Sequence, residues 1–327
     1  MLSYVLRRLL AMVPFVLLTS VTVFILIQLP PGDYISNYAA QLAESQETVD
    51  DAALKNLRER FGLGEPLHVQ YWKWISGVLT GDLGWSFEWQ QPVGPLIGER
   101  MALTVLLAVA TLLLTWGLAL PIGIYSAVRK NSIGDYLATL LGFIGLATPS
   151  FLLALGVMYL GATHFGQSVG GLFSPEYEAA PWSLAKMADL LAHLWVPMLI
   201  IGLSGTASLI RVMRANLLDE LNKPYVVTAR AKGLDEFTLL MRYPVRMALN
   251  PFVSTIGWIL PQVVSGSVIV AVVLNLPIAG PMLLQSLLSQ DMYLAGAFLV
   301  LLCCLTVIGT LISDLLLALI DPRIRLS

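Results

Sequence analysis

The sequence predicts an all-α integral membrane protein with six transmembrane helices, and three observations support this fold class. Of the 327 residues, 57% are hydrophobic and only 12% are charged, and the mean hydropathy is +0.77. This composition is too apolar for a water-soluble domain. Six apolar runs are each about as long as the roughly 20 residues that cross a bilayer. Basic residues are concentrated in alternate segments between these runs, which fixes an orientation under the positive-inside rule.

The six apolar runs are predicted to form a single transmembrane domain over residues 1–327. The first run has 21 residues without a charge and no small-residue cleavage site, so it is an uncleaved span rather than a signal peptide. Pro121, Pro149, Pro197 and Pro261 lie in or at the ends of later runs and predict kinks. The predicted spans are residues 9–29, 101–128, 136–162, 193–210, 252–274 and 294–320.

Residues 30–100 are predicted to be an outer loop that packs as a cap on the membrane surface. Two amphipathic helices are expected in it, one capped by Thr48 and one that carries Val69, Trp72, Ile75 and Leu79. Four of the eight tryptophans lie in this loop. Such amphipathic rings favour the boundary between membrane and water over a separate globular domain.

The charges place both termini and the segment over residues 211–250 in the cytoplasm. Most of the 19 Lys and Arg residues fall in the two termini, the turn at 129–135 and this segment, whereas the short outer loop at 163–192 carries only Lys186. Basic residues stay on the cytoplasmic side of short loops. The sequence therefore predicts a multi-pass protein of the cell inner membrane.

The cytoplasmic segment is predicted to fold as a helix, a glycine turn and a second helix. Pro224 suits a first helical turn, and Gly233 suits the left-handed residue that ends a helix, so residues 224–232 form the first helix. Asp235 is a good N-cap for a second helix over residues 236–243, which stops before Pro244.

This segment resembles the EAA loop of the permease subunits of ATP-binding cassette importers. The resemblance rests on the string from Tyr225 to Leu234, Tyr-Val-Val-Thr-Ala-Arg-Ala-Lys-Gly-Leu, followed by Arg242 and Arg246. It is most similar to the branch that imports dipeptides, oligopeptides and nickel. Strings in the outer loop, among them Gly-Asp-Leu-Gly at 81–84, and the end Asp-Pro-Arg-Ile-Arg at 321–325 match the same branch. The sequence departs from the family where Val-Thr-Ala replaces Glu-Ala-Ala at 227–229 and where Tyr243 replaces a common His.

The resemblance implies a type I importer permease architecture in which this loop is a coupling helix that docks on a cytoplasmic ATPase. The implied partners are a similar second permease subunit, forming a heterodimer, two cytoplasmic ATPases and an extracytoplasmic substrate-binding protein. The implied ATPase-coupling residues are Tyr225, Thr228, Ala229, Arg230, Ala231, Lys232, Gly233, Leu234, Asp235, Phe237 and Arg242.

The chain itself is predicted to be a transporter subunit without enzymatic activity and without a cofactor. It contains no GxxxxGK[ST] stretch to hold nucleotide phosphates, so ATP and Mg belong to the partner subunits. The net charge of −2 gives no footprint for nucleic acid, and the three histidines lack ligand spacing. The resemblance implies a peptide cargo, with oligosaccharide or nickel as alternatives within the same branch.

Two further classes are weighed against the importer. The string Gly202-Leu203-Ser204-Gly205 has the GxSG form of rhomboid intramembrane proteases, but the last span contains no histidine. His193 precedes Ser204 by eleven residues in one helix, about 16 Å along the axis, so small-residue helix packing is favoured. A passive channel has no need of a helix-glycine-helix loop.

Asp314 is the one carboxylate inside a predicted span. A charge within a bilayer is costly and is by default functional, either on a pathway or paired with a basic group. It lies near the inner end of the span, and together with residues 321–325 it matches the C-terminal signature of the family that the chain resembles. This resemblance implies a structural ion pair or cap rather than contact with the solute.

Overall fold

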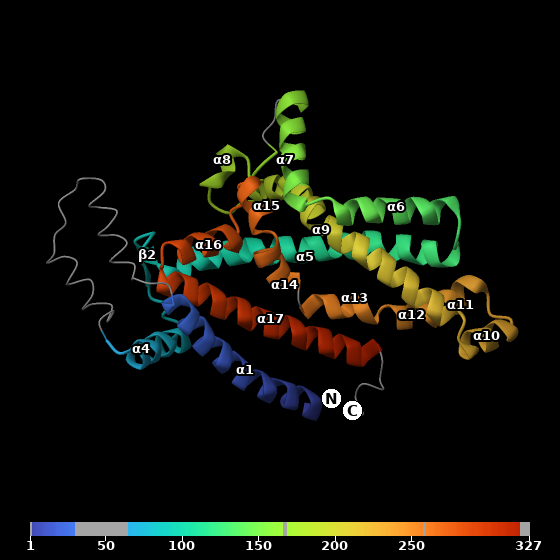
Figure 1. Ribbon diagram of the computed structural model, residues 1–327, viewed down its shortest axis with the longest axis horizontal. Helices are drawn as coiled ribbons and strands as arrows, with labels where there is room; N and C mark the ends of the chain where they lie inside the picture. The colour runs from blue at the N-terminus through green and yellow to red at the C-terminus, as the bar shows by residue number, and fades with distance from the viewer. Residues whose placement is uncertain (1, 30–64, 166–168, 258, 321–327) are drawn as a thin grey trace. The chain divides into compact units, whose positions relative to one another are not determined.

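The computed structural model describes residues 2–29, 65–165, 169–257 and 259–320. Nearly all regular structure in these ranges is helical (Figure 1). The strands that they contain are β1 (Trp85–Ser86) and β2 (Gln91–Pro92), which pair antiparallel. The expected helix capped by Thr48 lies outside the described residues.

Four helices are long and apolar enough to cross a membrane, and they match four of the predicted spans. They are α1 (Leu2–Gln28), α5 (Val93–Val128), α9 (Leu184–Leu221) and α17 (Met292–Ile320). Pro121 and Pro197 lie inside continuous helices α5 and α9.

The predicted span over residues 136–162 is bent. It is built from α6 (Ile133–Ala147), α7 (Ser150–Leu160) and a π-helical turn at Gly161–Phe165, with a bend of 96° between the two halves. Thr148 is extended, with φ −86° and ψ 120°, because the ring of Pro149 disfavours helical geometry in the residue before it. Counting this bent pair as one span gives five among the described residues.

The remaining predicted span, residues 252–274, is not a continuous helix. Its pieces are α13 (Asn250–Ser254), a 3₁₀ turn (Thr255–Gly257), α14 (Ile259–Pro261), a π-helical turn (Gln262–Gly266) and α15 (Val268–Val273). Six transmembrane helices are therefore not confirmed. Pro261, which supplies no backbone N–H, lies at the end of one of these pieces.

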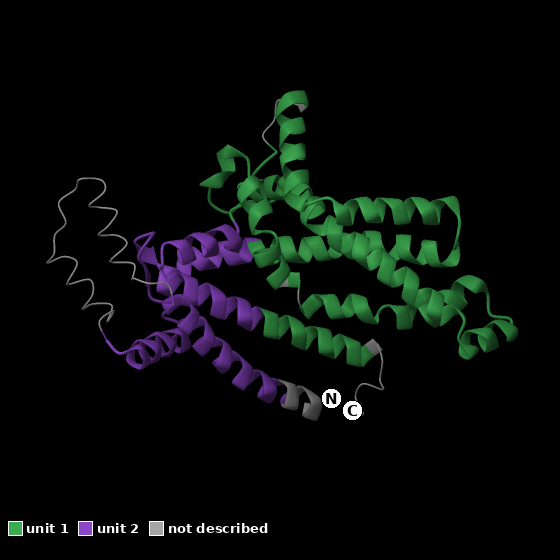
Figure 2. Ribbon diagram, in the orientation of Figure 1, with its two compact units in different colours: residues 1–5, 104–277, 306–327 green, residues 6–103, 278–305 purple. Residues whose placement is uncertain are grey.

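The chain divides into two compact units (Figure 2). Unit 1 comprises residues 1–5, 104–277 and 306–327, and unit 2 comprises residues 6–103 and 278–305. The prediction of a single transmembrane domain stays a prediction.

Unit 2 confirms the second amphipathic helix expected in the segment at 30–100. Helix α4 (Leu67–Thr80) buries Gln70, Trp74 and Ile75, and Trp74 and Ile75 join a core cluster with Phe24. Of the predicted apolar stripe, Ile75 is therefore buried, whereas Trp72 and Leu79 are 68% and 78% exposed. Trp74 packs closely over Gly296 of α17, where an added Cβ would lie 2.8 Å from its ring.

A buried carboxylate ties the β-hairpin of unit 2 to the start of α17. Asp291 accepts hydrogen bonds from Ser86 Oγ at 2.5 Å, from the Glu88 amide at 3.2 Å and from the Leu294 amide at 3.2 Å. Burial raises the pKa of Asp291 despite these donors. The carboxylate also serves as the N-cap of α17, so it joins two elements far apart in the chain.

Unit 1 is organised around α9, along which α6 and α12 (Pro244–Ala248) pack (Figure 1). The buried side chains of this core include Met213 and Leu217 from α9 together with Phe252. At the other end of α9, Lys186 is buried. Its ammonium donates to the Ala180 carbonyl at 2.7 Å and lies 4.8 Å from the Phe173 ring centre. These contacts offset the charge of Lys186 and hold the segment at 173–183 against the first turn of α9.

Candidate functional site

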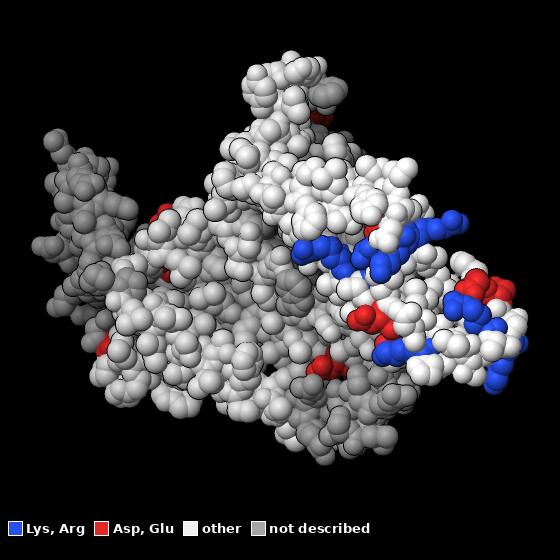
Figure 3. Space-filling view, turned by 45° about the vertical axis from the view of Figure 1, so that its right-hand side comes forward, with Lys and Arg blue, Asp and Glu red and all other residues white. Residues whose placement is uncertain are grey.

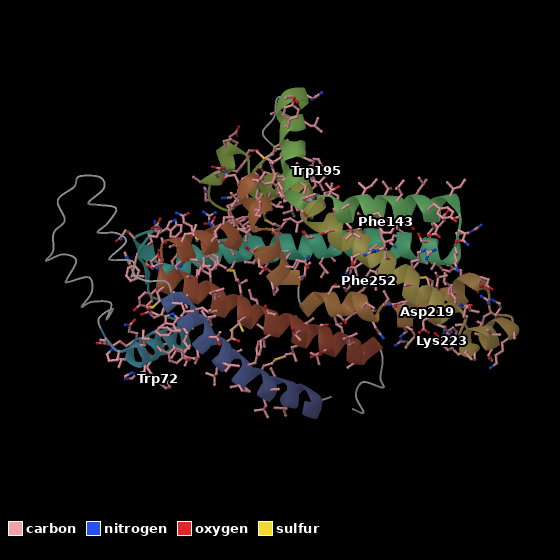
Figure 4. The ribbon with its side chains drawn as sticks, in the orientation of Figure 1. Trp72, Phe143, Trp195, Asp219, Lys223 and Phe252 are labelled. Atoms are coloured by element: carbon pink, nitrogen blue, oxygen red, sulfur yellow. The ribbon has the colours of Figure 1, made fainter. Side chains whose placement is uncertain are left out.

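Helix α9 is the element that positions the candidate site. It runs for 38 residues from Leu184 to Leu221, about 57 Å at 1.5 Å per residue, which exceeds the roughly 30 Å hydrocarbon core. Asp219 and Lys223 lie at its far end (Figure 4). The chain therefore leaves the apolar region on a rigid helix before it enters the polar segment.

The polar segment folds as the sequence predicted, within one residue at each boundary. Helix α10 (Pro224–Ala231) is followed by Gly233 at φ +81°, and α11 (Glu236–Arg242) begins after Asp235. The Asp235 carboxylate accepts a hydrogen bond from the Thr238 amide at 2.9 Å, which lowers the pKa of Asp235. We call α10, this turn and α11 the α10–α11 hairpin.

The hairpin closes on a small core of its own. Val226 and Leu239 are fully buried and Ala229 nearly so, with Leu234 and Tyr243 packed against them. Ala229 and Leu234, two of the predicted coupling residues, therefore contribute to the inside of the hairpin. Their small or branched apolar side chains fix the angle between α10 and α11.

An ion pair reinforces this closure on the outside of the hairpin. The Arg230 guanidinium donates two hydrogen bonds to the Glu236 carboxylate, at 2.5 and 3.1 Å, and this pairing lowers the pKa of Glu236. Both side chains are substantially exposed, at 48% and 67%, so the pair orients the helices more than it stabilises them.

The hairpin also exposes apolar side chains. Phe237 is 73% exposed, Val227 56%, Met241 45% and Tyr225 38%. Partial burial and the nearby Glu220 carboxylate, which accepts the hydrogen bond of the Tyr225 hydroxyl, raise the pKa of Tyr225. Sequence reasoning missed Val227 and Met241, which stand out only as apolar residues in a polar loop.

Most of the remaining predicted coupling residues are also exposed. Thr228 donates its hydroxyl to the Pro224 carbonyl at 2.9 Å, a hydrogen bond within α10. Basic side chains from the hairpin and the neighbouring turns gather at this end of unit 1 (Figure 3). The exposed predicted residues besides Tyr225, Arg230 and Phe237 are Thr228, Ala231, Lys232, Gly233, Asp235 and Arg242.

A second feature near the hairpin was not predicted from the sequence. The Arg214 guanidinium on α9 donates to both carboxylate oxygens of Asp135, each at 2.8 Å. Asp135 is buried, and it also accepts from the Asn131 amide at 2.9 Å. Arg214 lies seven residues before the end of α9, so this ion pair holds α9 to the first turn of α6 about 10 Å before the hairpin begins.

The GxSG string lies at a close contact between two helices, and the role of Asp314 stays a prediction. A Cβ on Gly202 would lie 3.1 Å from Thr115 Oγ1 and 3.2 Å from Thr111 Cγ2, so α9 and α5 approach closely at this glycine, as small-residue packing predicts. His193 lies on α9 with Ser204, and its Nδ1 is 2.8 Å from the Asp189 carbonyl oxygen. Asp314 is half-buried near the end of α17.

These features define a class of protein. Over the described residues, no group of three or more His, Cys, Asp or Glu could hold a metal ion, and the site is a structured polar hairpin at the end of a long membrane helix. The molecule is an integral membrane protein whose site is a structured hairpin with exposed apolar side chains, which suits contact with another protein.

Comparison with known proteins identifies the family within this class. Residues 119–326 match the model described as "Binding-protein-dependent transport system inner membrane component", and residues 1–108 match its N-terminal companion. The chain belongs to this family and is an ATP-binding cassette importer permease of the peptide branch. It is a transporter subunit and is not itself an ATPase.

Curated relatives agree along the whole length. The chain is 35% identical to a putative peptide permease protein of Brucella ovis, with 100% of each chain covered. It is 32% identical to the oligopeptide transport system permease protein AppB of Bacillus subtilis, covering 99% of this chain and 100% of the relative. It is 31% identical to the glutathione transport system permease protein GsiC of Salmonella paratyphi A, covering 99% of each.

Proposed function

We propose that the α10–α11 hairpin is the EAA coupling loop of this permease and docks on a cytoplasmic ATPase subunit. The observation that carries the proposal is the combination of a closed internal core and an exposed apolar face on the same hairpin. Phe237, at 73% exposure, is a large apolar side chain held in a fixed position. Exposed apolar groups rimmed by charges favour a protein interface.

The proposed assembly contains a second, similar permease subunit, two ATPases that bind ATP and Mg, and an extracytoplasmic substrate-binding protein. The chain would cross the membrane six times, with the bent pair α6 and α7 and the broken segment at 250–273 each counted as a span. Both termini would then lie in the cytoplasm. The basic residues at the hairpin end of α9, Arg211, Arg214 and Lys223, support this orientation.

In this assembly, ATP binding closes the ATPase pair and moves the two docked hairpins. Because α9 continues without a break from the hairpin into the apolar region, the movement reaches the membrane helices. The transporter then shifts between two packed states that open to opposite sides.

We propose peptides as the cargo of this assembly. The relatives described above are named for peptides, oligopeptides and glutathione. None of these three is named for nickel or an oligosaccharide, so neither alternative is carried further.

The test of the coupling assignment is Gly233→Val. Gly233 has φ +81° with open space around its Cβ position, so valine introduces no clash and costs about 1 kcal/mol or more through the left-handed backbone alone. The variant should insert and pair with the second permease but should lose bound ATPase and substrate-stimulated ATP hydrolysis. Gly233→Ala should be intermediate. Co-purification of the ATPases and hydrolysis assays on the purified complex measure both effects.

Gly81→Val is the matched control. Gly81 ends α4 at φ +85°, also with open space around its Cβ position, so valine there carries the same backbone cost on a loop assigned to the outer side. It should leave ATPase binding unchanged. Normal transport by Gly233→Val with its ATPases attached, or equal loss in both variants, would overturn the assignment.

A further inference from the structure

The segment from Asn250 to Val273 is an interrupted membrane segment. Its sequence is apolar and carries no charge between residues 252 and 274, yet it contains a 3₁₀ turn at 255–257 and a π-helical turn at 262–266. Helices α5, α9 and α17 are continuous, whereas the segment at 133–165 is also bent and also ends in a π-helical turn. The segment at 250–273 combines two kinds of irregular turn within one uncharged stretch.

The sequence explains where the helix breaks. Pro261 supplies no backbone N–H, and its carbonyl accepts a hydrogen bond from Ser265 Oγ at 2.7 Å. The hydroxyl of Ser267 donates to the Val263 carbonyl, and that of Thr255 donates to the Phe252 carbonyl at 2.6 Å. Hydroxyls that bond carbonyls in the preceding turn compete with the backbone N–H groups and bend helices.

Irregular backbone is found at only a few kinds of position within a bilayer. Hydrocarbon offers no hydrogen bonds, so such backbone is found where it is buried in protein or where it lines a water-filled path. In transporters, broken membrane helices commonly carry the solute site.

The break here has one side buried in protein and one side open. On the buried side, Val263 and Val264 are almost fully covered, and Gly257 approaches Thr310 of α17 closely enough that a Cβ would lie 3.1 Å from its Oγ1. On the open side, Ser265 and Gly266 are exposed. A polar, small-residue surface is therefore presented at the π-helical turn.

An unused acceptor lies in the same turn. The Oε1 atom of Gln262 is buried and has no hydrogen-bond partner among the described residues. A buried acceptor without a donor is costly, and its natural complement is an N–H group. The Ser265 hydroxyl, which donates to the Pro261 carbonyl, keeps its lone pairs to accept a second N–H.

We propose that Gln262 and Ser265 form a hydrogen-bonding step of the solute pathway, where they accept N–H groups of the transported peptide. The Gln262 oxygen is closed off in the present conformation, so the cargo reaches it when the segment rearranges during transport. The proposal deepens the peptide-importer function and rests on it. It assigns the contact to peptide N–H donors because the unpartnered Oε1 atom of Gln262 and the Oγ atom of Ser265 can each accept a hydrogen bond.

The first test replaces Gln262 by leucine in the complete importer. Gln262→Leu removes an unsatisfied polar group from an apolar site, so folding and membrane insertion should be preserved or improved. Uptake of an equimolar tripeptide mixture into membrane vesicles should then require about 3- to 10-fold more peptide for half-saturation, the effect of one lost hydrogen bond. ATP hydrolysis without peptide should remain at the level of the unmodified complex.

Thr111→Val is the matched control. Thr111 also has a buried hydroxyl oxygen with no hydrogen-bond partner among the described residues, but it lies in the continuous helix α5. It should leave the half-saturating concentration unchanged. An unchanged value for Gln262→Leu, or the same increase in both variants, would overturn the proposal.

A second test probes the open side without changing Gln262. In a chain with Cys303 and Cys304 replaced by alanine, Ser265→Cys should react with a membrane-impermeant maleimide in energised vesicles, and the tripeptide mixture should slow the reaction at least threefold. Leu18→Cys, at an exposed leucine of α1, should not show protection by peptide. A Ser265→Cys thiol that is unreactive, or equally reactive with and without peptide, would contradict the pathway assignment.

Failure of the proposal for Gln262 and Ser265 can be distinguished from failure of the proposed peptide-importer function. If the chain were not part of a peptide importer, the unmodified complex would show no ATP-dependent tripeptide uptake. If only the present inference fails, the unmodified complex takes up peptide and the variants behave like it.

Discussion

At the scale of single residues, Gly202 decides between a packing role and a catalytic role for the GxSG string. A Cβ there would lie within 3.2 Å of Thr111 and Thr115, so Gly202→Val should separate α9 from α5 and cost about 1–3 kcal/mol of stability, as overpacking does. Thermal unfolding of the purified complex measures this loss. Ser204→Ala should leave both stability and peptide uptake nearly unchanged. Intact uptake and stability in Gly202→Val would show that the glycine has no packing role.

The predicted roles of single residues were confirmed where each role depends only on local backbone geometry. Gly233 has the positive φ that ends a helix, and Asp235 caps the next helix, because both depend only on neighbours in the chain. The inward position of Ala229 against Leu239 was not predictable in the same way. It depends on how two short helices pack on each other.

At the scale of elements, the ion pair between Asp135 and Arg214 should govern how well α9 transmits movement from the hairpin. Lysine keeps the charge but cannot make both 2.8 Å hydrogen bonds to Asp135. Arg214→Lys should therefore keep the complex assembled and its ATPases active, while peptide taken up per ATP hydrolysed falls about 2- to 10-fold. Parallel uptake and hydrolysis measurements on reconstituted vesicles give this ratio.

Arg211→Lys is the control for that experiment. Arg211 lies one turn earlier on α9, with its guanidinium 5.9 Å from the Phe143 ring centre, a cation–π contact that lysine can retain. Its ratio of uptake to hydrolysis should not change. A normal ratio in Arg214→Lys would mean that the ion pair only stabilises the fold.

The sequence located the helices more reliably than it indicated which helix faces are buried and where helices are interrupted. Hydropathy located α1, α5, α9 and α17 because each needs only length and apolar composition. It did not reveal that residues 250–273 break into short turns, since hydropathy averages over the hydroxyl and proline positions that compete for backbone hydrogen bonds. In α4 the pattern indicated Ile75 but not the burial of Gln70 and Trp74, because long-range packing covers these two side chains.

At the scale of the whole molecule, contacts between distant parts of the chain were outside the reach of sequence patterns. Asp135 and Arg214 are 79 residues apart, and Ser86 and Asp291 are 205 apart. Each residue alone resembles an ordinary polar group near the end of an apolar run. Only the fold brings them together, so the resemblance to a permease family indicated the function while leaving these pairs unassigned.

The orientation of the whole chain in the membrane is the remaining prediction. Helix α9 is about 57 Å long, so residues just before and just after it must lie on opposite sides of the bilayer. Lys186, in the first turn of α9, is buried by carbonyls and aromatic rings, whereas Arg211 and Lys223 are exposed at its far end. Positive charges accessible at that end predict that it lies in the cytoplasm.

Single cysteines at the two ends of α9 test this orientation. In a chain with Cys303 and Cys304 replaced by alanine, Glu176→Cys in α8 (Pro175–Glu178) and Asn222→Cys at the end of α9 both introduce exposed thiols. An impermeant maleimide added to spheroplasts should label the first and not the second, and inverted vesicles should give the opposite pattern. Labelling of Asn222→Cys from outside, with Glu176→Cys protected, would put the α10–α11 hairpin on the wrong side for an ATPase. That result would also overturn the assignment of the α10–α11 hairpin as the coupling loop.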